Sequence, residues 1–153
     1  MNAKNKSFAL PLTFVGIMFF AIGFALGINS LLVPVLQGSL GISNAASYLI
    51  IAATFIPFLI FGYPAGLTIK AIGYKRTMSL SFIIFAVAFY LFILSADYKS
   101  FSLFLLASFI SGAANAYLQA SVNPYITILG PLESAAKRIS IMGICNKLAW
   151  PIP

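Results

Sequence analysis

The chain has very little charge: among its 153 residues there are nine lysines and arginines, two acidic residues and no histidine. Most enzymes build acid–base pairs and metal sites from histidine and carboxylate side chains. The single cysteine, Cys145, excludes an intrachain disulfide and has no base near it in the sequence to activate it. We therefore expect no catalytic residue, no metal site and no cofactor, and a protein that is not an enzyme.

The few charges leave four long apolar runs uninterrupted. Hydrophobic residues make up 61% of the chain and charged residues 7%, whereas soluble domains have about 25% charged residues. A helix needs about 20 such residues to cross a bilayer core of about 30 Å. The sequence therefore predicts an all-α integral membrane protein, embedded in the lipid bilayer. The expected helices cover residues 8–36, 45–69, 77–96 and 101–130, and 139–153 begins a fifth that is too short to cross.

Basic residues alternate between the connections of these helices. The N-terminal tail and the four successive connections carry two, none, three, one and two of them. This alternation predicts an N-terminus on the cytoplasmic side of the inner membrane. Because the basic residues are dispersed and do not form one patch, nucleic acid is not an expected partner.

Polar side chains interrupt the apolar helices at a few positions. Asn115, Gln119 and Asn123 recur every four residues and place three carboxamides along one side of the fourth helix. This spacing favours a polar cavity over helix packing, and Pro124 removes a backbone donor beside it. Carboxamides both donate and accept, which suits a neutral polyhydroxylated solute. Asn29 in the first helix is open to two interpretations, a hydrogen bond between helices or a ligand contact.

Lys147 is the only charge deep in an expected membrane segment. An intramembrane lysine is a functional candidate by default. Three interpretations stay open: the side chain reaches toward the headgroups or pairs locally, it contributes a charge to the cavity, or its ammonium takes the place of a coupling cation.

Two stretches carry a family resemblance. The run from Gln119 to Arg138, QASVNPYITILGPLESAAKR, closely resembles the fourth helix and following loop of bacterial sugar permeases. These are the fucose and glucose/galactose symporters of the major facilitator superfamily. The second connection is similar to the superfamily's loop motif, in which two glycines seven apart frame a tight turn before basic residues. The matching positions are Gly66, Gly73, Lys75 and Arg76.

The resemblance implies a carrier of two six-helix halves around a site at the bilayer midplane. Residues 1–153 would then be part of the N-terminal half, with four complete transmembrane helices and a truncated fifth. The implied function is symport of a neutral sugar by alternating access, coupled to sodium or protons. Ser30 stands where both branches have an acid, which removes one coupling group. The implied substrate-binding residues are Asn29, Gln119, Asn123 and Asn146.

The last residues no longer resemble the family. Pro151 and Pro153 would break a helix at membrane depth. We expect a chain that stops early, is inactive alone, and has the complementary C-terminal part of a split carrier as a further partner. The alternative is a membrane partner or regulatory module derived from a carrier fragment, without transport activity of its own.

Overall fold

The computed structural model describes residues 9–41 and 43–150, and the described residues fold into α-helices joined by short connections. Most residues in the long apolar runs are good or tolerable helix formers, and a helix satisfies every backbone group internally, as a bilayer core requires. The helices are α1 Ala9–Leu40, α2 Asn44–Ile72, α3 Tyr74–Asp97, α4 Phe101–Ile128 and α5 Ala135–Leu148, with a short 3₁₀ turn, η1 Leu132–Ser134, before α5.

Four of the described helices are long and apolar enough to cross a membrane, which confirms the predicted fold class. Their bounds differ from the expected runs by a few residues. α1, α2 and α3 continue into polar residues beyond the apolar runs, whereas α4 ends at Ile128, two residues before the expected end. α5 begins four residues before the expected start at Ile139, and α1 ends four residues after the expected end at Leu36. The candidate spans are Leu10–Val35, Ala45–Ile72, Tyr74–Asp97 and Phe101–Ile128.

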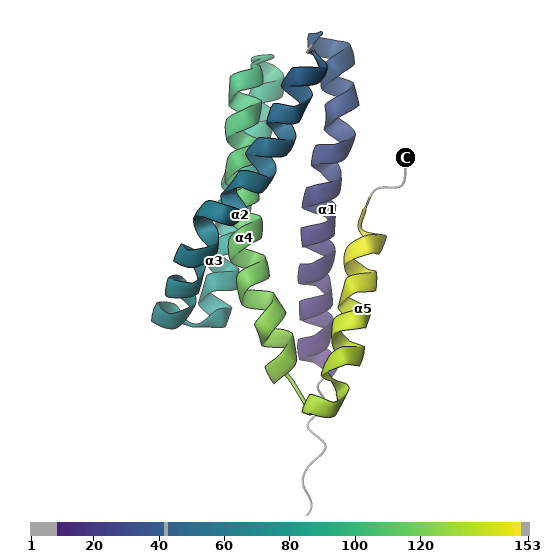
Figure 1. Cartoon of the computed structure of the whole chain (residues 1–153), viewed down its shortest axis with the longest axis vertical. Coiled ribbons are helices and arrows are strands. Elements are labelled where there is room, and N and C mark those ends of the chain that lie inside the picture. The colour runs from purple at the N-terminus through teal and green to yellow at the C-terminus, as the bar shows by residue number, and fades with distance from the viewer. Residues whose placement is uncertain (1–8, 42, 151–153) are drawn as a thin grey trace, which may run out of the picture.

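The helices run up and down through the bundle. The start of α1, the α2–α3 connection and the α4–α5 connection lie at one end, and the other two connections lie at the opposite end (Figure 1). Lys70, Lys75 and Lys137 all belong to the end where α1 begins. The arrangement agrees with the alternation of basic residues, and the assignment of that end to the cytoplasm stays a prediction.

The connection between α2 and α3 is much shorter than the loop predicted from the motif. Gly66 lies inside α2, Lys75 and Arg76 lie in the first turn of α3, and only Gly73 lies between the helices. Gly73 has φ 81°, a backbone conformation that glycine adopts without steric cost, and its N–H donates to the carbonyl of Ile69 at 2.9 Å. One glycine is enough to reverse the chain here, so the helices continue into the expected connection from Lys70 to Arg76.

α4 is the most buried helix and packs extensively against both α3 and α2. Its small-residue face meets α2 at Gly112, where an added Cβ would collide with the backbone carbonyl of Thr54. On another side, Phe104 packs against Phe92 of α3, with ring centroids 5.0 Å apart. These three helices form one group, seen together on one side of the molecule (Figure 1).

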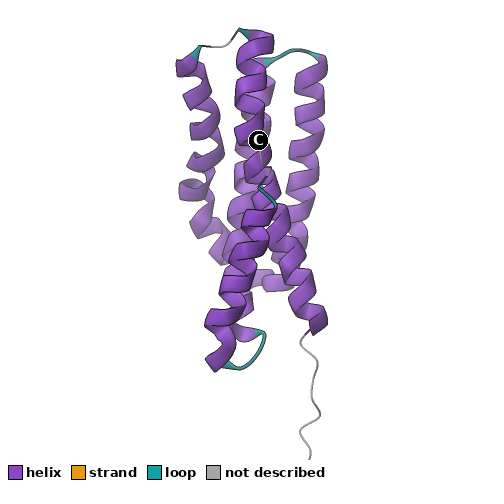
Figure 2. Cartoon of the chain, turned by 90° about the vertical axis from the view of Figure 1, so that its right-hand side faces the viewer, coloured by secondary structure: helices purple, strands orange, loops and turns teal. Residues whose placement is uncertain are grey.

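α5 packs along α1, and the two lie side by side opposite the other three helices (Figures 1 and 2). Gly23 of α1 is the point of closest approach, since a Cβ there would collide with the backbone carbonyl of Asn146. A core of buried apolar residues joins this pair to α3 and α4. That core contains Val15, Ile22, Ala25, Met78, Phe85, Ala114, Leu118, Val122, Ile126 and Met142.

Arg138 ties the end of α4 to the start of α5. Its side chain is only 7% exposed, and its guanidinium donates to the carbonyls of Ile126, Thr127 and Pro131 at 3.0–3.3 Å and to the hydroxyl of Ser134. The last carbonyls of a helix have no partner within the helix. The guanidinium therefore caps α4, although the sequence marks Arg138 only as a basic loop residue.

Candidate functional site

The three carboxamides predicted along α4 lie in different environments. Asn115 is 1% exposed, and its Oδ1 has no hydrogen-bond partner in the described part of the chain. Gln119 is half-buried, and Asn123 is exposed. The series thus leads from the helix-packed interior to the surface. A solute could reach Gln119 or Asn123 in this arrangement, but Asn115 is covered by its own chain.

Asn146 connects α5 to α1. Its Nδ2 donates to the carbonyl of Phe19 at 3.0 Å, four residues before the close contact at Gly23. The amide nitrogen therefore already holds the two helices together, while Oδ1 stays available to a ligand. A sugar contact by Asn146 remains a prediction, and in this arrangement it would be made through the oxygen.

Two further sequence candidates lie on the same pair of helices. Asn29 belongs to α1, but its side chain lies outside the described part of the structure. Lys147 is exposed, and its Nζ lies 5.0 Å from the ring centroid of Trp150, three residues further on. This is cation–π geometry. Among the interpretations left open for Lys147, the structure shows local pairing.

The motif residues lie in α2, in the first turn of α3 and between these two helices. Lys75 and Arg76 are exposed, and Gly66 is half-buried within α2. Lys75 lines a cavity of about 340 Å³ at the end of the bundle where α1 begins, together with Leu10, Phe14 and Tyr125 among others. Among the described residues no three His, Cys, Asp or Glu side chains come together in a way that could hold a metal ion.

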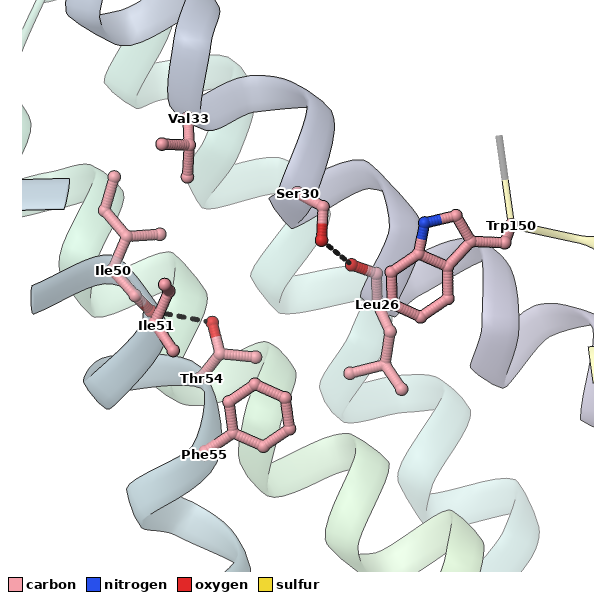
Figure 3. Close-up of a pocket in the computed structure, with 8 residues that line it drawn as sticks. All are labelled: Leu26, Ser30, Val33, Ile50, Ile51, Thr54, Phe55 and Trp150. Carbon is pink, nitrogen blue, oxygen red and sulfur yellow. Dashed lines mark hydrogen bonds between the residues drawn. The ribbon is translucent and has the colours of Figure 1, made fainter. Parts of the chain in front are cut away.

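A pocket of about 230 Å³ lies between α1, α2 and Trp150, which stands two residues beyond the end of α5 (Figure 3). The Ser30 hydroxyl donates to the carbonyl of Leu26 at 3.5 Å, and the Thr54 hydroxyl donates to that of Ile50 at 2.9 Å. Both oxygens can still accept a hydrogen bond from a ligand. The pocket is lined by Leu26, Ser30, Val33, Ile50, Ile51, Thr54, Phe55 and Trp150.

Sequence reasoning missed this pocket. It treated Ser30 only as the replacement of an acid, and it placed Trp150 in the segment that departs from the family. The available signal was the i, i+3 spacing of Lys147 and Trp150, a spacing that brings a cation and an aromatic ring close together, although α5 itself ends at Leu148.

An up-and-down bundle of membrane-length helices defines the described chain as part of a multi-pass α-helical membrane protein. The chain belongs to the Major Facilitator Superfamily, whose family model matches residues 14–152.

The similar proteins are sugar transporters by name. The chain is 35% identical over 151 residues to the glucose/galactose transporter of Brucella abortus biovar 1 (strain 9-941), covering 99% of this chain and 37% of that protein. It is 28% identical over 143 residues to the L-fucose-proton symporter of Escherichia coli (strain K12), covering 94% of this chain and 33% of that protein. The chain thus spans about a third of the length of these relatives.

A solved structure shows the same arrangement of helices. The crystal structure of the Major Facilitator Superfamily transporter FucP in the outward conformation matches the chain with a TM-score of 0.81 and 28% sequence identity. The match covers 95% of this chain and 35% of that one.

Proposed function

We propose that the chain forms the N-terminal part of a secondary active transporter for a neutral sugar of the glucose, galactose or fucose class. The whole carrier would work by alternating access in the inner membrane, with the N-terminus of the chain in the cytoplasm. The observation that carries the proposal is that nearly the whole chain matches sugar carriers in both sequence and fold.

The pocket between α1 and α2 supports a neutral substrate. Its lining combines apolar side chains with two hydroxyls and an indole, and it includes no charged side chain among the described residues. A cation would lose its hydration there without gaining a counter-charge, which is costly. A neutral sugar gives up hydrogen bonds to water on entering the pocket, and the hydroxyls and the indole of the pocket replace them with bonds of similar strength.

Symport needs a coupling cation, sodium or a proton, and the chain offers little to bind one. Ser30 cannot take up or release a proton at physiological pH, and the two acidic residues, Asp97 and Glu133, lie near or beyond helix ends. We propose that coupling depends on residues in the complementary C-terminal part of the carrier. That part is also the partner expected to complete the transport pathway.

A chimaera tests the proposal. This chain would replace the matching segment of the Brucella glucose/galactose transporter, in cells without other galactose uptake, and uptake of labelled D-galactose would be measured with sodium and pH varied separately. We expect uptake well above that of cells making either part alone. Background uptake by a chimaera that reaches the membrane in normal amounts would contradict the proposal.

A further inference from the structure

We infer that the pocket between α1 and α2 is a monosaccharide subsite in which the indole of Trp150 packs against the C–H face of a pyranose ring. The inference rests on the proposed sugar function and adds to it a contact residue and a geometry of binding.

The pocket has the size and lining of a site for a small amphipathic ligand. Its volume is about 230 Å³, below the roughly 300–1,000 Å³ of sites for drug-sized ligands. Apolar side chains form most of its wall, and the polar groups of Ser30, Thr54 and Trp150 are few. A pyranose matches this lining, because its hydroxyls project around the ring edge while C–H groups cover part of each face.

The indole of Trp150 lies at the edge of this pocket and offers a hydrogen-bond donor. The side chain is 38% exposed, and its Nε1–H has no hydrogen-bond partner among the described residues. Figure 3 shows the nitrogen edge of the ring on the side of Ser30. A tryptophan in a partly apolar site usually finds a partner for this N–H. A sugar hydroxyl between Trp150 and Ser30 would supply that partner while the ring face packs on C–H groups.

Lys147 orients the indole ring of Trp150. Its ammonium lies 5.0 Å from the centroid of the Trp150 ring, and a cation over an aromatic face restrains the ring by electrostatic attraction. A side chain that is already ordered loses less conformational freedom when a ligand binds. Lys147 is therefore a positioning residue in this subsite, acting through Trp150 and not through a contact with sugar.

Stacking against an indole ring discriminates between two ligands that carry similar hydroxyl groups. D-galactose is a closed ring with an axial C4 hydroxyl, so the C–H groups of C3, C4 and C5 form one continuous apolar patch. Galactitol has a similar set of hydroxyls on an open, flexible chain and has no such patch. Stacking on Trp150 thus favours galactose over galactitol, in addition to the conformational freedom that the open chain loses on binding.

Trp150 is the only tryptophan of the chain, so its fluorescence reports on this pocket alone. The experiment titrates D-galactose and galactitol into the purified chain in lipid nanodiscs. We expect a saturable change in fluorescence with galactose and at least fivefold weaker binding of galactitol. This measurement needs no substitution and is independent of the folding of any variant.

Equilibrium dialysis with labelled galactose then assigns the contact. Trp150→Ala is expected to weaken binding about tenfold and Trp150→Phe, which keeps a ring but loses the N–H, about threefold. Tyr90→Ala is the control, because Tyr90 is an exposed aromatic residue of α3 outside the pocket. Circular dichroism checks that each variant keeps its helix content.

Two results would overturn the inference. If Trp150→Ala binds galactose as tightly as the unchanged chain, Trp150 is no platform, and the proposed function stands. If the unchanged chain binds no galactose, the pocket is not a subsite of this chain, and uptake by the chimaera decides separately whether the sugar function holds.

Discussion

The bundle consists of two groups of helices that are held together differently. α4 packs extensively against both α2 and α3, whereas α5, with 14 residues, covers only part of α1. Both groups place a glycine where two backbones meet, Gly112 in the first and Gly23 in the second. The pocket takes its walls from α1, α2 and Trp150, so it lies where the two groups adjoin. Its shape therefore depends on how the smaller group sits against the larger one.

The α2–α4 contact is the place where a substitution should cost most. Gly112→Ala puts a methyl group against the backbone carbonyl of Thr54, with Pro57 only 3.0 Å from the added carbon. A backbone atom cannot rotate away, so the helices must separate, and we expect a loss of about 3 kcal/mol of stability. Thermal unfolding of the purified chain in detergent, followed by circular dichroism, measures the loss.

Gly62→Ala is the matched control for this prediction. Gly62 also lies in this group of helices, but an added Cβ there meets nothing within 4 Å. Alanine is a better helix former than glycine by about 1 kcal/mol, so the control should be neutral or slightly stabilising. Equal unfolding temperatures for the two variants would show that the close approach at Gly112 does not hold the group together.

Gly23→Ala should release α5 without disturbing the larger group. The added methyl group collides with the backbone of Asn146, and we expect a cost of about 2 kcal/mol, concentrated in the docking of α5. Cys145 is the only cysteine, is partly buried on α5 and lies near Gly16 of α1. The rate of its alkylation by a membrane-permeant maleimide should rise about 30-fold, because each 1.4 kcal/mol corresponds to a factor of ten.

The control for α5 is Gly143→Ala, since a Cβ at Gly143 meets nothing within 4 Å. Its alkylation rate should equal that of the unchanged chain. If Gly23→Ala also leaves the rate unchanged, α5 does not depend on this contact and the division into two groups is mistaken.

Arg138 links the two groups through the end of α4. Arg138→Gln removes hydrogen bonds to three backbone carbonyls, and we expect a loss of about 2 kcal/mol. Arg138→Lys keeps the charge but not the forked geometry, so it should recover only part of the loss. Hydrogen exchange of the last turn of α4 measures the effect, which should be confined to that turn and the start of α5. Full recovery by lysine would mean that charge alone matters.

The membrane helices are predicted well from the sequence, because an uncharged apolar run of about 20 residues matches the thickness of a bilayer core and is rare in soluble domains. Side-chain roles are predicted less well where the partner is backbone. Arg138 donates to backbone carbonyls of α4, and no sequence pattern marks such carbonyls as partners. Trp150 becomes part of a pocket only through α1 and α2, more than 90 residues earlier in the chain. The carboxamides recur regularly on α4, but burial separates Asn115 from Asn123, because the packing of α2 and α3 decides which turns are covered.

Asn146→Ala is the smallest expected effect and the sharpest test of how α1 and α5 are joined. The substitution removes one hydrogen bond, from Nδ2 to the carbonyl of Phe19, and should cost about 1 kcal/mol. Asn123→Ala, at an exposed amide of α4, is the control and should cost close to nothing. Thermal unfolding in detergent measures both.

A double variant that combines Asn146→Ala with Gly23→Ala tests whether the two residues act on the same contact. Both act on the same contact between α1 and α5, so once Gly23→Ala has separated the helices, the hydrogen bond is already lost. The cost of the double variant should then fall short of the sum by about 1 kcal/mol, as expected for neighbouring sites. A strictly additive cost would mean that Asn146 stabilises the chain through a partner other than Phe19.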